Sequence, residues 1–286
     1  MPISGQFLFY NTIKITSISV ICILFGAILL FLISKNIKDK KITKNLKKLS
    51  IGLLICSFIM IGFIFYKYKT RHNNFIENLE ISQSKNNFVF GIDVSQYNGS
   101  IDWDIVKTSK HPIKFVFIRS TMGIDGFDRR FKTNIKEAEK NGFIVGTYHF
   151  FRPNENPVLQ FENFKNHTII KKGHLLPVLD IEDSGDLNKN MLINNIKKWL
   201  LLAEQEYRVK PIIYTGRKFY YNYIEEEFKS YPLWIASYSG KNKLSEINYN
   251  FHQFTEKVKI KGIDNLTDGN DFNGNLNDLK SNFLIK

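Results

Sequence analysis

The segment LPVLDIED, Leu176–Asp183, joins an apolar run to three acidic residues. Side chains alternate between the two faces of a strand, so Asp180 and Glu182 share one face and Ile181 takes the other. Two carboxylates at the end of a buried strand are costly unless they bind or act on something. Their mutual repulsion and partial burial raise one pKa enough to provide a proton donor near neutral pH.

Asp180 and Glu182 are therefore candidate catalytic acids. The alternatives are solvated acids at an ordinary strand end, or a divalent-metal site. Asp183 is expected to be a capping or loop residue.

Similar apolar bursts recur along the chain. They are FVFGIDVS (88–95), FVFIRS (115–120), IVGTYHFF (144–151), PIIYTG (211–216), LWIASY (233–238) and FHQF (251–254). Helical stretches over 131–141, 158–167 and 191–207 separate several of them. This alternation predicts parallel strands joined by helices, and seven or eight strands in so short a region favour a small barrel over an open sheet.

The predicted fold class is thus α/β, an irregular TIM-like β/α barrel over residues 88–286. Helical patterns become rare after Trp234, so the last part of the barrel is expected to be irregular. Polar residues gather at the carboxyl ends of the bursts, where a parallel barrel has its active site.

Two apolar runs precede this domain. Ile15–Ile33 contains no charged residue, and Leu49–Tyr66 is 18 residues long, which spans roughly 27 Å as a helix. We therefore predict two transmembrane helices, at 13–34 and 49–66, in a membrane anchor over 1–70, followed by a polar linker over 71–87. A buried core helix is disfavoured because neither run has a polar face. A cleaved signal peptide is the alternative for the first run, but its basic segment follows the run instead of preceding it.

The charge of the chain indicates an orientation in the membrane. Seven lysines and one acid lie between the two runs, in residues 35–48, whereas Lys67, Lys69 and Arg71 follow the second run. Short basic loops stay in the cytoplasm, so the carboxy-terminal domain is expected outside it, on a multi-pass protein of the cytoplasmic membrane with the lipid bilayer as a partner. Residues 1–87 carry +9 of the net charge of +13, which argues against nucleic-acid binding.

Other chemistries find little support in the sequence. Cys22 and Cys56 are the only cysteines, and both lie in the apolar runs, so 88–286 has no disulfide framework or thiolate metal site. The G-x-S-x-G, H-E-x-x-H and G-x-x-x-x-G-K motifs do not occur. The six histidines show no metal-ligand arrangement, and His149 is expected to be structural.

Single acids and aromatic residues give weaker signals. Asp93 ends the first burst, and Asp271 lies in a Gly/Asn-rich segment where turn acids are common. Aromatic rings at burst ends can stack on sugar rings, although most aromatic residues here are assigned to the core. Tyr148 and Trp234 are the expected exceptions, and truncating Trp234 is predicted to weaken ligand binding and leave the fold intact.

Seven blocks appear in the order of a known family. They are GIDVSQYNGSIDW, FVFIRST, FDRRFKTNIKEAEKNGFIVGTYHFF, LPVLDIED, KPIIYTG, YPLWIASY and a closing DFNG. From about Gly91 to Leu279 the chain resembles glycoside hydrolase family 25, the Chalaropsis-type lysozymes, which are N-acetylmuramidases. The resemblance implies a flattened β/α barrel that needs no metal or organic cofactor. It implies a substrate as well, the peptidoglycan glycan strand, cut after N-acetylmuramic acid. The orientation predicted from the charges would put this reaction at the outer face of the cytoplasmic membrane.

The resemblance also implies residue roles. The family's four acids fall on Asp93, Asp180, Glu182 and Asp271, with Glu182 as the general acid. Its substrate-binding residues fall on Tyr148, Tyr214, Trp234, Gln253 and Asn273. Attack by the substrate's own acetamido group, oriented by Asp180, and attack by water both remain open.

The chain departs from the family pattern at three places. Met122 replaces a common Glu, His252 replaces the Trp of a W-Q-Y/F block, and the closing block reads N-D-F-N (270–273) instead of V-D-L-N. Met122 and His252 keep open a hydrolase of another polysaccharide. A non-catalytic, membrane-tethered wall-binding module is the other alternative, and the retention of all four acids argues against it.

Overall fold

The computed structural model describes residues 20, 23–84, 88–109, 112–239 and 241–286. The chain divides into two compact units, Met1–Asn73 and Asn74–Lys286. The second unit holds the strands and the remaining helices, and it contains every candidate site residue.

The amino-terminal unit is helical where it is described, apart from residues 37–39. Within α2 (Lys40–Ser84), the stretch Lys40–Tyr66 is the single one in the described part of the chain long and apolar enough to cross a membrane. Only 11 % of its most apolar window is buried, unlike a core helix. A shorter apolar helix, Ile23–Asn36, precedes it, and the Ser50 Oγ donates a hydrogen bond to the Ala27 carbonyl at 2.8 Å.

The prediction of two transmembrane helices is thus supported for the second helix only. Residues 13–19 and 21–22 of the first predicted helix lie outside the described residues, and its described part is short. The predicted linker 71–87 is helical as far as Ser84, because α2 continues through it.

Eight strands of the second unit close a barrel. The nine strands are β1 (Phe88–Val94), β2 (Phe115–Met122), β3 (Gly126–Phe127), β4 (Ile144–Phe150), β5 (Val178–Asp180), β6 (Ile212–Gly216), β7 (Leu233–Ala236), β8 (Phe251–Val258) and β9 (Thr267–Asn273). Their order is β1-β9-β8-β7-β6-β5-β4-β2-β3, and pairing of β1 with β2 closes the ring, leaving β3 outside it. The predicted α/β barrel is therefore confirmed.

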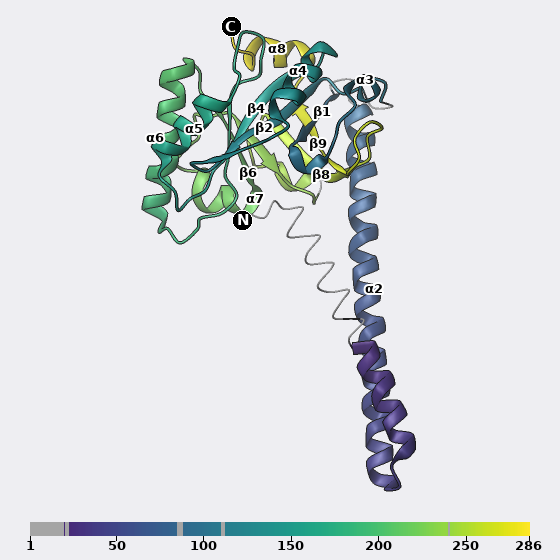
Figure 1. Ribbon diagram of the computed structural model, residues 1–286. Coiled ribbons are helices and arrows are strands. Elements are labelled where there is room, and N and C mark those ends of the chain that lie inside the picture. Colours follow the sequence, from purple (N-terminus) through teal and green to yellow (C-terminus); the bar gives the residue numbers. More distant parts are fainter. Residues whose placement is uncertain (1–19, 21–22, 85–87, 110–111, 240) are drawn as a thin grey trace. The chain divides into compact units, whose positions relative to one another are not determined.

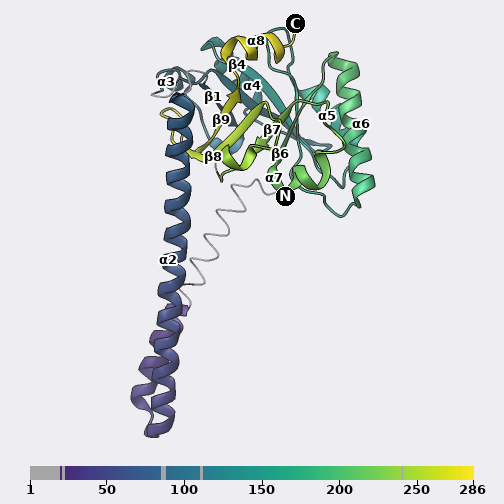
Figure 2. The same ribbon diagram turned by 180° about the vertical axis from the view of Figure 1, so that it is seen from behind.

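Helices cover the outside of the barrel unevenly. They are η1 (Gln96–Asn98), α3 (Trp103–Val106), α4 (Phe131–Lys140), α5 (Pro157–His167), α6 (Lys189–Tyr207), α7 (Arg217–Phe219), η2 (Tyr220–Ile224), η3 (Lys241–Leu244) and α8 (Leu276–Asn282). α5 and α6 lie side by side on one flank in both views (Figure 1 and Figure 2). β9 runs antiparallel to both β1 and β8, so the barrel becomes irregular after β7, as predicted.

Strand alternation separates an inner core from three outer hydrophobic clusters among the described residues. Phe115 and Phe117 of β2 point inward and join a cluster with Trp234 and Phe251, whereas Val116 and its outer neighbours pack under α3 and α4. Gly91 lies on the inner face of β1, where an added Cβ would come within 2.4 Å of the Phe115 ring. Glycine at this position lets the aromatic filling of the barrel approach the backbone.

His149 lies on the outer face of β4 and is fully buried. Its Nδ1 is 2.8 Å from Thr121 Oγ1, its Nε2 is 3.2 Å from Gln160 Oε1, and its ring stacks on Trp199. Burial lowers the pKa of His149 from 6.5 to about 3. The expected structural role of His149 is confirmed.

This burial predicts acid sensitivity. Between pH 6.5 and 3 the unfolded chain protonates His149 while the native chain does not, so the contribution of His149 to stability falls as pH falls below 6.5. The contribution is about 1.4 kcal/mol of unfolding free energy per pH unit. Urea titrations from pH 7 to pH 4 should give a shallower pH slope for His149→Asn than for the wild type. The exposed His167→Asn should keep the wild-type slope, and a common slope for all three proteins would refute the prediction.

Candidate active site

Three of the four predicted acids meet at the carboxyl ends of β1 and β5. Asp93 and Asp180 are the last inward-facing residues of these strands, and each side chain is buried. Glu182 follows β5 by two residues and is partly buried. The charges of Glu182 and Asp93 both act on Asp180, and the charge of Asp93 acts on Glu182. The three carboxyl groups therefore form one cluster.

Burial sets the protonation of this cluster. It raises the pKa of Asp180 well above its usual range, helped by the charges of Glu182 and Asp93 and opposed by Arg119. The pKa of Glu182 rises to about 8, through burial first and then through Glu256, Asp183 and Asp93. Glu182 thus holds a proton at neutral pH and can donate it, as a general acid must.

A network of amide and phenol groups fixes Asp93. Its Oδ2 accepts hydrogen bonds from Gln253 Nε2 at 2.9 Å and Asn270 Nδ2 at 2.7 Å. The Gln253 Oε1 accepts in turn from Tyr214 OH at 2.9 Å and Tyr238 OH at 2.7 Å. Burial raises the pKa of Asp93, and these hydrogen bonds oppose the rise. The structure therefore brings Tyr214 and Gln253, two of the predicted substrate-binding residues, to the cluster.

Tyr148 also faces the cluster. It lies on β4 next to β5, is buried, and feels the charges of Arg119, Asp93 and Asp180. The Arg119 Nε lies 3.4 Å from Asp128 Oδ2, and its guanidinium covers the ring of Tyr97.

Asp183, the third acid of the segment, is exposed and accepts a hydrogen bond from the Gly185 N–H at 2.8 Å, as expected of a loop residue.

The structure does not bring Asp271 to the cluster. β9 pairs Asp268 with Asp93, and Asp271 with Phe90, a residue of the outer core. Strand alternation therefore turns Asp268 and Asn270 inward and Asp271 outward. The Asp268 side chain hydrogen-bonds Asp93. We correct the predicted fourth acid from Asp271 to Asp268.

Asn273, which was predicted to bind the substrate, also lies away from the acid cluster. It pairs with Phe88 at the start of β1, which is the opposite end of the barrel from Asp93. Its Nδ2 donates to the Tyr249 carbonyl at 3.1 Å. Asn270 takes the place beside the acids instead.

Trp234 lies in the inner core, not on an open surface. Only 2 % of it is exposed, and its ring stacks on Phe117 with centroids 4.5 Å apart. Its Nε1 donates to Asn270 Oδ1 at 2.8 Å, and Asn270 in turn donates to Asp93. The predicted substrate contact is replaced by a supporting position beneath the acids.

Sequence reasoning missed several residues of the site. They are Arg119, Tyr238, Glu256, Asp268 and Asn270. A signal for two of them was present, because Asp-x-Asn occurs twice in succession, at 268–270 and 271–273.

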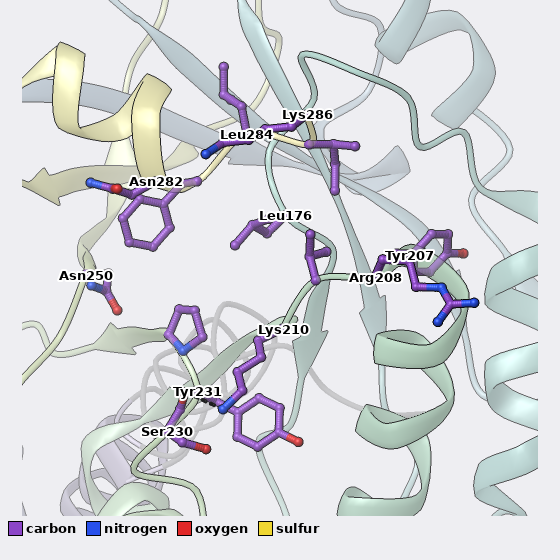
Figure 3. Close-up of a pocket in the computed structure, with 14 residues that line it drawn as sticks. Leu176, Tyr207, Arg208, Lys210, Ser230, Tyr231, Asn250, Asn282, Leu284 and Lys286 are labelled. Carbon is purple, nitrogen blue, oxygen red and sulfur yellow. Dashed lines mark hydrogen bonds between the residues drawn. The ribbon is translucent and has the colours of Figure 1, made fainter.

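A pocket of about 670 Å³ lies at the opposite end of the barrel. It is lined by residues that precede β5, β6 and β7, among them Leu176, Lys210 and Pro232. Figure 3 shows Lys210 reaching to Ser230 beside Tyr231. No predicted site residue lines this pocket. In the described part of the chain, no group of three or more His, Cys, Asp or Glu side chains could hold a metal ion.

Comparison with known proteins identifies close counterparts of the barrel. Residues 92–263 match the model of glycosyl hydrolases family 25. Lysozyme M1 of Streptomyces globisporus is 29 % identical over 203 residues, which cover 65 % of this chain and 68 % of that protein. The structure of a family 25 glycosyl hydrolase from Bacillus anthracis superposes with a TM-score of 0.63 at 30 % identity, covering 67 % of this chain and 92 % of the other. A bacterial lysozyme from Streptomyces coelicolor gives 0.60 at 26 % identity, covering 68 % and 97 %.

Proposed function

Because the chain belongs to family 25 of the glycosyl hydrolases, we propose that this glycoside hydrolase is a lysozyme that cuts peptidoglycan between N-acetylmuramic acid and N-acetylglucosamine. The observation that carries the proposal is the cluster of Glu182, Asp180 and Asp93 at the carboxyl ends of β1 and β5, where burial raises the pKa of Glu182 to about 8. A proton donor next to further carboxyl groups is the arrangement that glycosidic bond cleavage requires.

In the proposed mechanism, Glu182 protonates the glycosidic oxygen as the bond to the muramic acid breaks. Asp93, held by Gln253 and Asn270, faces the positive charge that develops on the sugar ring. No described residue hydrogen-bonds the buried Oδ1 of Asp180. We assign this oxygen to the N–H of the substrate's acetamido group, which would then attack the anomeric carbon through its carbonyl oxygen.

The reaction products identify which glycosidic bond is cut. Full-length protein in detergent is incubated with purified peptidoglycan, and the new reducing ends are identified by mass spectrometry after borohydride reduction. Muramic-acid ends support the proposal. Glucosamine ends would assign a different bond, and binding without new ends would favour a wall-binding module.

We further propose that α2 holds the barrel at the outer face of the cytoplasmic membrane. The apolar run Leu49–Tyr66 within the candidate span Lys40–Tyr66 and the seven lysines of 35–48 before this run support the orientation. The orientation is the same whether or not residues 13–34 also cross the membrane, since the basic segment directly precedes the apolar part of α2. A reporter that is active only in the cytoplasm, fused after Lys286, should be silent. A strong signal from it would contradict the orientation.

The corrected fourth acid gives a paired prediction. Asp268→Asn should lower kcat/KM on peptidoglycan at least tenfold, since loss of one electrostatic group of an active site typically costs on the order of 100-fold. Asp271→Asn, on the outer face of the same strand and turned away from the cluster, should lower kcat/KM much less than Asp268→Asn. Steady-state kinetics give kcat/KM for both variants, and their melting temperatures show whether both remain folded. The reverse ranking would restore Asp271 to the site.

A further inference from the structure

β8 carries two irregularities beside the acid cluster. Along its ladder with β9, Gln253 pairs with Asn270, Thr255 with Gly269 and Val258 with Thr267. Each step takes one more residue on β8 than on β9, as in a β-bulge. A bulge changes which face the following side chain occupies, and bulges beside active sites re-aim side chains in this way.

The first bulge turns Glu256 inward. Gln253 faces the barrel interior, and Phe254 belongs to the outer core. Thr255 stays on the outer side as well, because a Cβ added at Gly269 would meet Thr255 Cγ2 at 2.9 Å and Phe254 Cζ at 3.3 Å. Alternation resumes at Glu256, whose side chain therefore returns to the inner face next to Asp268.

Glu256 is buried there with only 7 % of its surface exposed. Among the charges that raise the pKa of Glu182, that of Glu256 has the largest effect, and the same holds for the pKa of Tyr238. Tyr238 in turn donates to Gln253, which holds Asp93. A negative charge that acts on Glu182 favours the protonated form of its carboxyl group.

We propose that Glu256 is a positioning residue for the hydrolysis, whose charge keeps the proton on Glu182 and so sets the upper pH limit of the activity. The inference rests on the proposed function, in which Glu182 is the general acid. Glu256 needs no contact with the substrate for this role.

The other charged and titratable groups around Glu182 limit the size of the effect. They are Asp93, Arg119, Tyr148, Asp180, Asp183, Tyr214, Tyr238 and Asp268, from β1, β2, β4, β5 and its following loop, β6, the segment after β7, and β9. Arg119 is the positive charge among them, and Asp128 already pairs with it. Removing Glu256 therefore leaves burial and the remaining acids in place, and the expected shift is about one pH unit.

The test is the pH profile of kcat/KM on peptidoglycan for full-length wild type and Glu256→Gln. The alkaline limb of the variant should move to lower pH by about one unit, because Glu182 loses its proton more easily without the neighbouring charge. A merely structural role would lower the rate at every pH and leave the limb in place.

Controls separate the possible failures. Glu246→Gln removes the same charge at an exposed position before β8 and should keep the wild-type limb. Glu256→Asp keeps the charge and should move the limb less than Glu256→Gln. If the amide variant does not fold, Glu256→Ser is the second neutral variant, with the same shift expected. An unshifted limb in a folded neutral variant would overturn the role of Glu256, whereas an inactive wild type would overturn the proposed function.

Discussion

Glu182→Gln is expected to lower kcat on peptidoglycan by on the order of 100- to 10,000-fold, the usual loss when a general acid is removed. The amide keeps the shape of the side chain but has no proton to give to the leaving oxygen. Binding of peptidoglycan should survive, since the rest of the cluster is intact. Turnover and sedimentation binding assays measure the two properties separately.

Glu182→Gln should also be more stable than the wild type at high pH. The pKa of Glu182 is about 8 in the native protein and 4.5 without its surroundings, so between these values the unfolded chain gives up a proton that the native chain retains. The contribution of Glu182 to wild-type stability therefore falls as pH rises from 4.5 to 8, and the glutamine variant escapes this loss. Its advantage in melting temperature should be largest at pH 8 and vanish below pH 4.5.

Two neighbours serve as comparisons. Asp183→Asn, in the exposed loop, should keep nearly full activity. Asp180→Asn should be almost as damaging as Glu182→Gln if Asp180 orients the acetamido group. Wild-type turnover by Glu182→Gln would show that another carboxyl group is the acid.

The barrel and its two central acids could be predicted because they depend on short-range spacing. Apolar bursts separated by helical stretches indicate parallel strands, and the i, i+2 spacing of Asp180 and Glu182 predicts that both side chains point the same way where β5 ends at Asp180. Neither inference requires knowledge of which strand pairs with which. Pairing of β1 with β2 closes a ring of eight strands, which agrees with the seven or eight strands predicted.

The rest of the site depends on register, which the sequence does not display. Asp268-x-Asn270 and Asp271-x-Asn273 are equivalent as patterns, and only the pairing of Asp268 with Asp93 selects the first. Glu256 reaches the inner face through a bulge, which breaks the period of two on which pattern reading relies.

Depth within the barrel is equally hidden from the sequence. An inward aromatic residue at a strand end can reach the substrate or fill the core, and the difference depends on the layer that the strand stagger assigns to it. Tyr214 and Trp234 lie on neighbouring strands and pair with each other in the ladder. The Tyr214 hydroxyl reaches Gln253 at the acid cluster, whereas the Trp234 ring lies against Phe117 in the core.

Trp234→Ala is therefore expected to destabilise the barrel strongly. Truncating a buried Trp typically costs about 3–5 kcal/mol, and at 2–4 °C per kcal/mol the melting temperature should fall on the order of 10 °C. The ring that stacks on Phe117 and meets Tyr214 edge-on is lost, and Asn270 loses its donor. Calorimetry at pH 6 measures the loss.

Trp234→Phe separates packing from hydrogen bonding, because it keeps a ring against Phe117 but has no N–H for Asn270. It should lose about 1–3 kcal/mol for the unpaired buried oxygen, less than the alanine variant. Since Asn270 also holds Asp93, the phenylalanine variant should lower kcat more than it raises KM. If Trp234 contacted the sugar directly, the alanine variant would raise KM and leave the melting temperature close to that of the wild type, and the core position argued from its burial would be wrong.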